Sequence, residues 1–540
     1  MIKSSYTPYG WPPATERNFA MSVTRIYQSS LIMSALLSSG GLNAADVSVG
    51  AYAVANHSSC GAGNIPGTIA ELDKFFDDQN FGSHFHKNFY WKDARVKNSE
   101  WIKEGDYRAS SETNLGFDGS DASVLTYIAS HGVTSGGIYK ALTGSRNFGG
   151  CYIPTTSLEL GNNLSRYTIL STCQGLKIGN GDNPTAAGEN PSRTWKNAAK
   201  GVNCIFGYSN NMADADQYGE YLLNNIQDGQ TPLSQAFMDA SESVSPDNIP
   251  AVMCYGASEQ DAAEYLATNT QFETESRANT ASSWTYRIVN SRESSRGLSS
   301  KIPAAIRVNP AEINIEKVAS VFLGSGLKQI KSIKRKVFAS SAGRVSYQKD
   351  TGTLIIKNNL IDELKSEAVP SASEAEQIAA HALKVSGLAK SSGNLTVKAS
   401  AEDVIGSESG AQKVVARKIT FKQILAGYTT LSQQGSIDVS VGPGGTITEI
   451  KASILSLDKT FKAASVPTDL SARMEDVEAT AIQSVATKSP GGSYKVTGYR
   501  LGYDAGNFHK SRPMAPAVIA VTVEAAHGEF TRRFIEKINL

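Results

Sequence analysis

Two short stretches decide the fold class that this sequence predicts: YIASHG at residues 127–132 and ILSTCQG at residues 169–175. Each begins as an apolar strand and ends in a side chain that can do chemistry, His131 in the first and Cys173 in the second. The carboxyl ends of parallel strands meet at one edge of a sheet, where functional loops gather. If the two strands are neighbours, we therefore expect His131 and Cys173 to lie together at that edge.

The residues around these stretches, from about 45 to 289, alternate predicted strands with predicted helices. Asn190-Pro191 and Thr231-Pro232 are helix start signals, because proline is favoured in the first turn. This alternation is typical of an α/β domain with a mostly parallel sheet and helices on both faces. The predicted strands span residues 47–55, 123–130, 167–172, 203–208 and 250–255, and the predicted helices span 66–78 and about 260–267.

After about residue 295 the pattern changes. Residues 436–450 alternate strictly on either side of a glycine-rich turn, which predicts an antiparallel hairpin. Ser371 and Glu374 form a predicted capping box ahead of a helix at 373–388. A helix at 474–486 and a strand at 516–525 repeat this order, so we expect smaller α+β modules. The predicted boundaries are 1–44 for an N-terminal extension with a signal peptide, 45–295 for the first domain, 296–368 for a linker and small module, 369–460 for a second module and 461–540 for a third.

Composition places few limits on function. The 540 residues include 52 Lys plus Arg and 51 Asp plus Glu, for a net charge of +1. This balance gives no overall attraction to nucleic acid or to an anionic membrane. There are five cysteines, and an odd number leaves at least one thiol unpaired unless it pairs with another chain. Cys151, Cys204 and Cys254 are interpreted as core or disulfide residues.

The N-terminus has the layout of a signal peptide. Arg25 precedes an apolar run at 31–37, and small residues follow at 42–44. The run is too short for a stable membrane anchor. We therefore expect a signal peptide at about 21–44, translation from Met21, and a secreted or periplasmic protein without stable membrane insertion. The alternative is a buried helix.

A His-Cys pair at one sheet edge suits acyl transfer. A thiol near its free pKa of about 8.5 is mostly protonated at neutral pH, and a nearby imidazole can accept its proton. Thiolate attack on an amide carbonyl gives an oxyanion that needs fixed donors. The N–H groups of Cys173 and Gly132 are the candidates, because glycine lets the backbone approach a substrate closely.

The two stretches together resemble the caspase-like cysteine peptidases, a group that includes caspases, legumains, gingipains and separases. The family pattern is an apolar strand before His-Gly, followed by an apolar strand before a small residue and the nucleophilic Cys. The resemblance covers about residues 45–290 and is closest to an uncharacterised bacterial branch. It implies a three-layer αβα domain, a dyad of His131 as general acid/base and Cys173 as nucleophile, and an oxyanion donor at Gly132.

The resemblance to caspase-like peptidases says less about which residues bind the substrate. Relatives that cleave after basic residues have an Asp two positions before the Cys, where this chain has Ser171. The candidate substrate-binding residues are Gln174, Asp182 and Asp214. Further candidates are Asp118, Asp121 and Asp216 for a pocket that binds Arg or Lys, and Arg146, Arg166 and Arg193 for a pocket that binds Asp.

No metal and no cofactor are predicted. His57 and Cys60, and likewise His84 and His86, have spacings that a metal can use. Nothing in the sequence brings the two pairs together, and calcium held by Asp-rich loops has no better support. The basic run at 328–336 is interpreted as a solvated face, so no nucleic-acid partner is expected.

The second half resembles PepSY-type and thermolysin-propeptide-type modules through the hairpin at 436–447. This resemblance implies that residues 300–540 regulate or dock the first domain; an adhesive or substrate-binding accessory is the competing view. The predicted function is a secreted cysteine endopeptidase that acts on protein or peptide substrates. The alternatives are a catalytically inactive domain that serves as an interaction module, and another acyl transfer on the same dyad, such as transpeptidation or deamidation.

Overall fold

The structure is a computed structural model that describes residues 47–103, 119–147, 150–227, 229–291, 301–330, 335–358, 367–432, 434–462, 465–467, 473–506 and 513–540. The predicted signal peptide at 21–44, its start at Met21, and Asp118 lie outside the described residues.

Five strands of the first half pair in parallel, in the order β2-β1-β3-β7-β8. Four of them, β1, β3, β7 and β8, are short, apolar and almost fully buried, as the sequence predicts for strands covered on both faces, whereas β2 at the edge is partly exposed. All five strands predicted in the first half are confirmed within a few residues, the prediction at 250–255 as β9 (Pro250–Gly256), whereas β2 was not predicted. The bounds are β1 (Ser48–Ala53), β2 (His86–Lys92), β3 (Leu125–Ala129), β7 (Tyr167–Ser171) and β8 (Cys204–Tyr208).

Beyond β8 the same sheet continues with antiparallel strands, so the predicted fold class is wrong. The order runs β8-β9-β10-β17-β18-β20-β21-β16-β15-β14-β13, and every pairing along it is antiparallel. The bounds are β9 (Pro250–Gly256), β10 (Ala281–Ser291), β13 (Lys328–Ile330), β14 (Arg335–Ser340), β15 (Gly343–Gln348), β16 (Thr353–Asn358), β17 (Leu395–Ser407), β18 (Gln412–Leu425), β20 (Ser436–Val441) and β21 (Ile447–Ser453), with β19 (Tyr428–Thr429) paired to β18.

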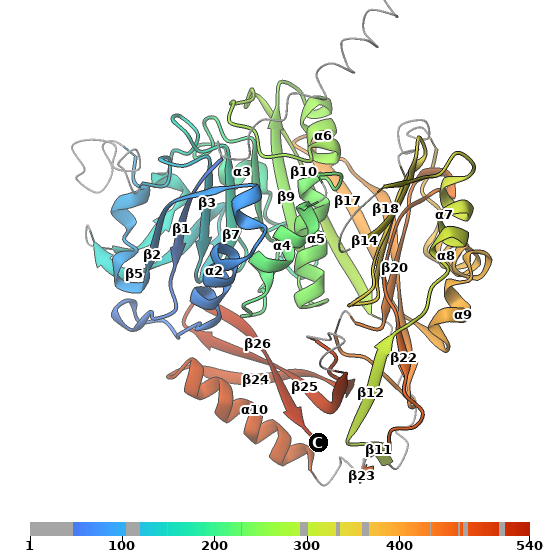
Figure 1. Cartoon of the computed structure of the whole chain (residues 1–540). Helices are drawn as coiled ribbons and strands as arrows, with labels where there is room; N and C mark the ends of the chain where they lie inside the picture. The colour runs from blue at the N-terminus through green and yellow to red at the C-terminus, as the bar shows by residue number, and fades with distance from the viewer. Residues whose placement is uncertain are drawn as a thin grey trace, which may run out of the picture.

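The molecule is therefore built on a large mixed sheet that is mostly antiparallel, and not on a mostly parallel sheet followed by separate small modules. The physical reason is that β10 offers a free edge to β17, with nine residue pairs in register from Ser283 to Ser291. Strands of the second half extend the first half's sheet instead of forming their own (Figure 1). Alternation along one strand shows that it is half buried, but does not identify the edge that it joins.

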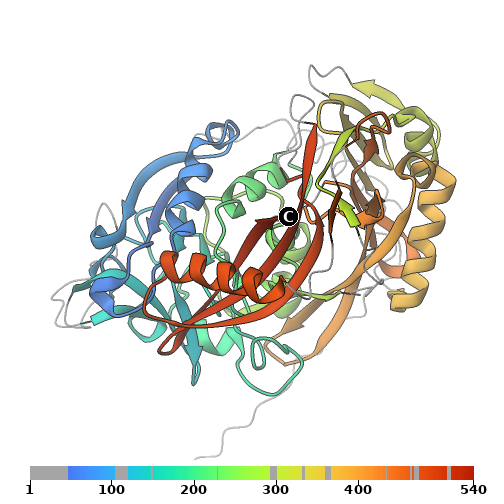
Figure 2. The ribbon, with the colours of Figure 1, turned by 90° about the horizontal axis from the view of Figure 1, so that it is seen from below.

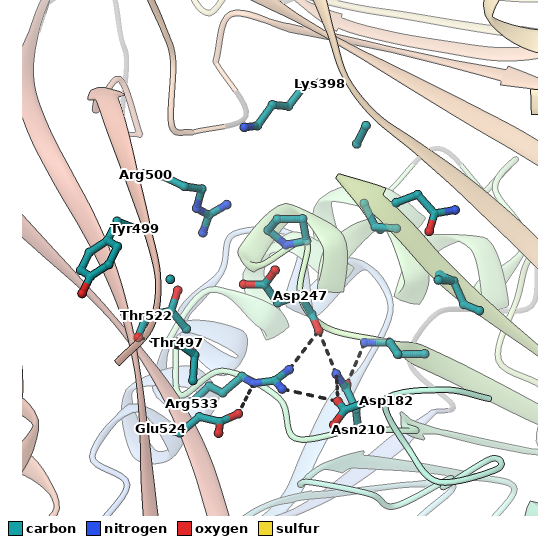
Figure 3. A pocket seen from close by; sticks show the side chains of 17 residues that line it. Asp182, Asn210, Asp247, Lys398, Thr497, Tyr499, Arg500, Thr522, Glu524 and Arg533 are labelled. Carbon is teal, nitrogen blue, oxygen red and sulfur yellow. Dashed lines mark hydrogen bonds and ion pairs between the residues drawn. The ribbon is translucent and has the colours of Figure 1, made fainter. Parts of the chain in front are cut away.

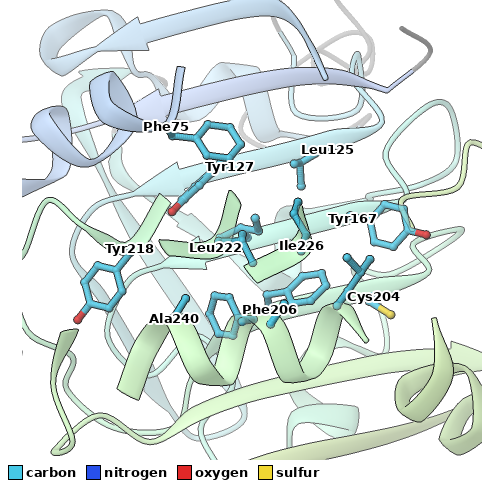
Figure 4. Close-up of a cluster of buried hydrophobic side chains, with 14 of the residues drawn as sticks. Phe75, Leu125, Tyr127, Tyr167, Cys204, Phe206, Tyr218, Leu222, Ile226 and Ala240 are labelled. Atoms are coloured by element: carbon cyan, nitrogen blue, oxygen red, sulfur yellow. The ribbon is translucent and has the colours of Figure 1, made fainter. Parts of the chain in front are cut away.

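The two faces of the parallel strands are covered differently, which also departs from a three-layer αβα arrangement. Helices cover one face, and their core includes Phe75, Tyr127 and Phe206 (Figure 4). On the other face a three-stranded antiparallel sheet and a short helix bury Tyr139 and Trp195. The bounds are α2 (Gly67–Asp77), α4 (Tyr218–Ile226), α5 (Leu233–Val244) and α6 (Glu259–Thr268) on the first face, and β4 (Gly132–Ser135), β5 (Ile138–Asn147), β6 (Gly150–Pro154) and α3 (Pro191–Trp195) on the second.

In the second half, helices α7 and α8 pack on the antiparallel strands around a separate core. The predicted capping box is confirmed: the Ser371 backbone N–H donates to the Glu374 carboxylate at 2.9 Å, and the Glu374 N–H donates to the Ser371 hydroxyl at 3.3 Å. The bounds are α7 (Ile315–Leu323), α8 (Ala372–Ser386) and α9 (Leu388–Ser392).

The C-terminal residues form a second sheet whose strand β26 reaches the first half (Figures 1 and 2). Strands β24, β25 and β26 pair antiparallel, β25 also pairs with β12, and α10 packs on this sheet. The bounds are β12 (Ala305–Pro310), β22 (Leu455–Leu457), α10 (Met474–Lys488), β24 (Ser493–Tyr503), β25 (Met514–His527) and β26 (Phe530–Asn539), with a small separate pair β11 (Lys301–Pro303) and β23 (Ser465–Pro467).

A buried charged cluster joins the two halves where β10, β17, β18 and α5 meet. The Arg287 guanidinium contacts Asp403 at 2.7 Å, Asp239 at 2.6 Å and Glu242 at 2.9 Å, and Lys418 lies 2.8 Å from Glu242. Burial raises the pKa of Asp239, but the charges of Lys418 and Arg287 outweigh it and hold that pKa far below its usual value.

Among the described residues, no helix has the length and apolar character needed to cross a membrane.

Candidate functional site

The structure brings His131 and Cys173 to the same edge of the sheet. Strands β3 and β7 are parallel neighbours with Ala129 opposite Ser171, so His131 and Cys173 each follow two residues beyond the same register position. The Ser130 N–H continues this pairing by donating to the Ser171 carbonyl at 3.3 Å. Both side chains are fully buried.

Gly132 is where the histidine loop and the cysteine loop touch. A Cβ atom on Gly132 would stand 2.6 Å from the Cys173 carbonyl oxygen and 2.8 Å from the Thr172 Cβ. Any other residue would push the two loops apart, because these separations are shorter than van der Waals contact. The close approach of the two loops therefore requires glycine at this position; the roles of the Gly132 and Cys173 N–H groups as oxyanion donors stay a prediction.

The contacts of His131 fix which nitrogen can act as a base. Its Nε2 lies 2.7 Å from the Gly63 carbonyl oxygen, which can only accept, so Nε2 carries the proton. Nδ1 is then the basic nitrogen, and it has no hydrogen-bond partner within the described part of the chain. Burial, helped by the neighbouring His57 ring at 4.8 Å, holds the pKa of His131 well below its usual value. The imidazole is thus neutral, with Nδ1 unprotonated.

Cys173 is the one free cysteine, since the other four form two disulfides, Cys60–Cys151 and Cys204–Cys254. Its thiol donates to the Thr531 carbonyl oxygen at 3.1 Å. The Arg532 Nη1 lies 3.9 Å from Sγ. Strand β26 of the C-terminal sheet therefore covers the Cys173 thiol.

Gln174, predicted to bind substrate, connects the two loops. Its Oε1 accepts from the Thr134 N–H at 3.2 Å, its Nε2 donates to Asn211 Oδ1 at 3.0 Å, and its carbonyl accepts from the Thr134 hydroxyl at 2.6 Å. Its φ of 57° turns the chain sharply just after the nucleophile. The Gln174 side chain thus holds β4 against the Cys173 loop, and both its amide oxygen and its amide nitrogen are already hydrogen-bonded within the protein.

The two predicted acidic residues lie at different depths. The side chain of Asp214 is 4% exposed, and its Oδ2 accepts from the Gly67 N–H at the start of α2 at 3.0 Å, a favourable position for a carboxylate. Its Oδ1 lies 3.7 Å from Arg532 Nη2. The Asp182 side chain is 71% exposed and pairs with Arg533 at 3.4 Å, at the surface of the molecule.

The remaining specificity candidates are engaged elsewhere. Asp121 accepts from the Ser165 N–H at 2.6 Å, and Asp216 pairs with Lys74 at 2.7 Å. Arg166 donates to backbone carbonyl groups, including that of Thr274. The structure shows no contact of Arg146 or Arg193 with Cys173 among the interactions of the described residues.

Sequence reasoning missed two residues, Glu71 and Arg532. Glu71 Oε1 accepts from the Tyr127 hydroxyl at 2.5 Å and Oε2 from the Ser171 hydroxyl at 2.9 Å, and burial raises the pKa of Glu71 to about 8. The sequence does place both charged side chains at positions where its pattern predicts a buried residue. Glu71 lies on the buried face of its helix one turn before Phe75, and Arg532 stands between two apolar residues of an alternating strand.

The residues weighed for a metal do not gather. Cys60 is bonded to Cys151, so it has no thiolate to offer, and His57 packs on His131. Within the described residues, no group of three His, Cys, Asp or Glu side chains is placed to hold a metal ion.

Comparison with known proteins adds a family of unknown function. Residues 52–287 match the family described as "Domain of unknown function (DUF6345)", a span that contains His131, Cys173, Glu71 and Asp214. No curated protein matches. One solved structure, an uncharacterised protein from Eubacterium rectale, is similar over 45% of this chain and 87% of its own, with 10% identity and a TM-score of 0.31.

Proposed function

We propose that the protein is a cysteine peptidase that hydrolyses peptide bonds with Cys173 as nucleophile and His131 as general acid/base. The observation that carries this proposal is the shared register position of the two residues at adjacent parallel strand ends, together with the basic Nδ1 of His131. A lone buried histidine or cysteine would be an ordinary core residue. A neutral imidazole and the only free thiol at adjacent ends of neighbouring strands form an arrangement suited to nucleophilic catalysis.

The reaction follows from these groups once β26 has moved away. His131 Nδ1 takes the Sγ proton, and the thiolate attacks the carbonyl carbon, forming a C–S bond and an oxyanion near the N–H groups of Gly132 and Cys173. The imidazolium then gives its proton to the leaving nitrogen as the C–N bond breaks. Water, deprotonated by His131, attacks the thioester, and the carboxylic acid leaves as the thiol is restored.

The proposed location is outside the cytoplasm, in the periplasm or medium. Two disulfides in one chain are typical of an oxidising compartment. The same compartment suits a peptidase that must stay inactive in the cell that makes it.

The test is cleavage of a mixed peptide library by the protein spanning residues 45–540. Because β26 covers the thiol, the library is offered to the wild type and to Arg532→Ala, each compared with versions that also carry Cys173→Ala or His131→Ala. Cleavage that needs both Cys173 and His131 supports the proposal. If Arg532→Ala has a reactive thiol yet yields no cleaved peptide, the peptidase proposal is wrong and an interaction module becomes the better account.

A further inference from the structure

We propose that β26 is a built-in occupant of the substrate groove, and that the pocket around Asp214 which holds Arg532 is the subsite for an arginine or lysine side chain of the substrate. This inference rests on the proposed function, because it assigns the substrate class and the regulation of the same site.

The backbone of β26 contacts the first half through one isolated β-bridge. The Asp214 N–H donates to the Arg533 carbonyl at 2.6 Å, and the Arg533 N–H donates to the Met212 carbonyl at 3.3 Å. These two bonds form a parallel bridge between Ala213 and Arg533. Addition of an extended segment to an exposed backbone edge is a common way for proteins to bind peptides. A substrate peptide can use the same edge when β26 leaves it.

The side chain of Arg532 points into the interior at the nucleophile. It is fully buried, with Nη1 3.9 Å from Cys173 Sγ and Nη2 3.7 Å from Asp214 Oδ1. Although burial opposes the charged form, the nearby Cys173 and Asp214 raise the pKa of Arg532, so the guanidinium stays charged. A buried charge needs an opposite charge in the pocket, and Asp214 supplies it. The pocket therefore matches a basic side chain that enters beside the thiol.

The strand sits in the site without being positioned for cleavage. The atom that faces Cys173 Sγ is the Thr531 carbonyl oxygen, which accepts the thiol proton at 3.1 Å. Nucleophilic attack requires approach to the carbonyl carbon, and a thiol that donates to the oxygen is not the reactive thiolate. Arg532 is also paired with Ala525 of β25, which holds this segment within its own sheet. These contacts explain how a segment with substrate features can act as an inhibitor.

The occupant is imperfectly held, so a substrate can compete with it. Nε and Nη2 of Arg532 have no hydrogen-bond partner in the part of the chain that the structure describes. Next to the groove, a cavity of about 650 Å³ separates the C-terminal sheet from the rest of the molecule (Figure 3). Arg533 bridges the edge of this cavity through Glu524 at 2.8 Å and Asp182 at 3.4 Å. Phe530 at the start of the strand packs on His131 and against Val133 and Leu142, so a competing substrate must replace these apolar contacts.

The experiment measures the rate at which iodoacetamide alkylates Cys173, the one free thiol, in the full chain. We expect at least a tenfold faster reaction for Arg532→Ala than for the wild type, and little change for Arg532→Lys. Lys537→Ala, which removes an exposed charge from the same strand, is the matched control and should stay at the wild-type rate. Circular dichroism and thermal unfolding establish that each variant is folded.

The second measurement tests the pocket itself. N-acetyl-arginine methylamide should protect Cys173 of Arg532→Ala from alkylation, whereas the norleucine and glutamate analogues should not. Protection should disappear in Arg532→Ala/Asp214→Asn. If Arg532→Ala is unfolded, Asp214→Asn alone in the wild-type background replaces it and should also accelerate alkylation. An unchanged rate in the folded variants, or equal protection by the norleucine analogue, overturns the inference. Selective protection without peptide cleavage would leave the pocket standing and remove the peptidase proposal.

Discussion

At the residue scale, Gly132 shows how closely the two functional loops depend on each other. Gly132→Ala should lower the proposed activity at least tenfold and cost about 1–3 kcal/mol of stability, because the added Cβ lies 2.6 Å from the Cys173 carbonyl oxygen. Peptide cleavage in the Arg532→Ala background and urea unfolding are the measurements. Gly82→Ala is the control, since a Cβ there meets nothing within 4 Å. Equal activity in the two variants would show that the loops are not packed as described.

Also at the residue scale, the buried imidazoles predict acid sensitivity. Burial lowers the pKa of His57 to about 3 and that of His131 well below its usual value. The unfolded chain binds protons on these groups below about pH 6.5, while the folded protein does not, so the free energy of unfolding falls as pH drops from about 6.5 toward 3. His57→Leu should remove up to about 1.4 kcal/mol of that loss per pH unit. Urea midpoints between pH 4 and 7 measure it, and the exposed His86→Gln variant should follow the wild type.

At the element scale, the disulfide Cys60–Cys151 fixes the loop that carries Gly63. This loop supplies the carbonyl that holds His131 Nε2 at 2.7 Å. A Cys60→Ser/Cys151→Ser chain should lose about 2–5 kcal/mol of stability and part of its peptide cleavage, because the bridge closes a long loop beside the imidazole. Chemical unfolding and the cleavage rate check both effects. A Cys204→Ser/Cys254→Ser chain tests whether the loss of activity belongs to the first bridge alone; equal loss of activity would contradict that role.

At the scale of the whole molecule, the ion cluster around Arg287 holds the two halves of the sheet together. Arg287→Ala leaves three buried carboxylates without that cation and should destabilise the protein by about 3–5 kcal/mol. Lys92→Ala breaks an exposed pair with Asp73 and should cost less than about 1 kcal/mol. Thermal and urea unfolding compare the two variants. Similar losses of stability would refute the idea that the cluster is the main polar contact between the two halves of the sheet.

The fold was predictable only as far as its local patterns reach. Strands β1, β3, β7 and β8, helix α2 and the capping box at Ser371 follow from periodicity and capping signals within about ten residues. The prediction of a mostly parallel sheet failed from β9 onward, because β9 runs antiparallel to β8 and β10 pairs with β17 more than a hundred residues later. No local pattern says which edge a strand will join, because pairing depends on the packing of the whole chain.

By itself, the sequence determined which residues stand at the ends of buried strands, and so placed His131 and Cys173 at the ends of two of them. It also singled out Asp214, though without distinguishing it from other acidic residues. Only the tertiary structure decided that Asp214 lies in a buried pocket and that Arg532, 359 residues from Cys173, fills it. The reason is that local patterning records which side chains are buried, whereas the partner of a buried charge is set by the folding of distant segments against each other.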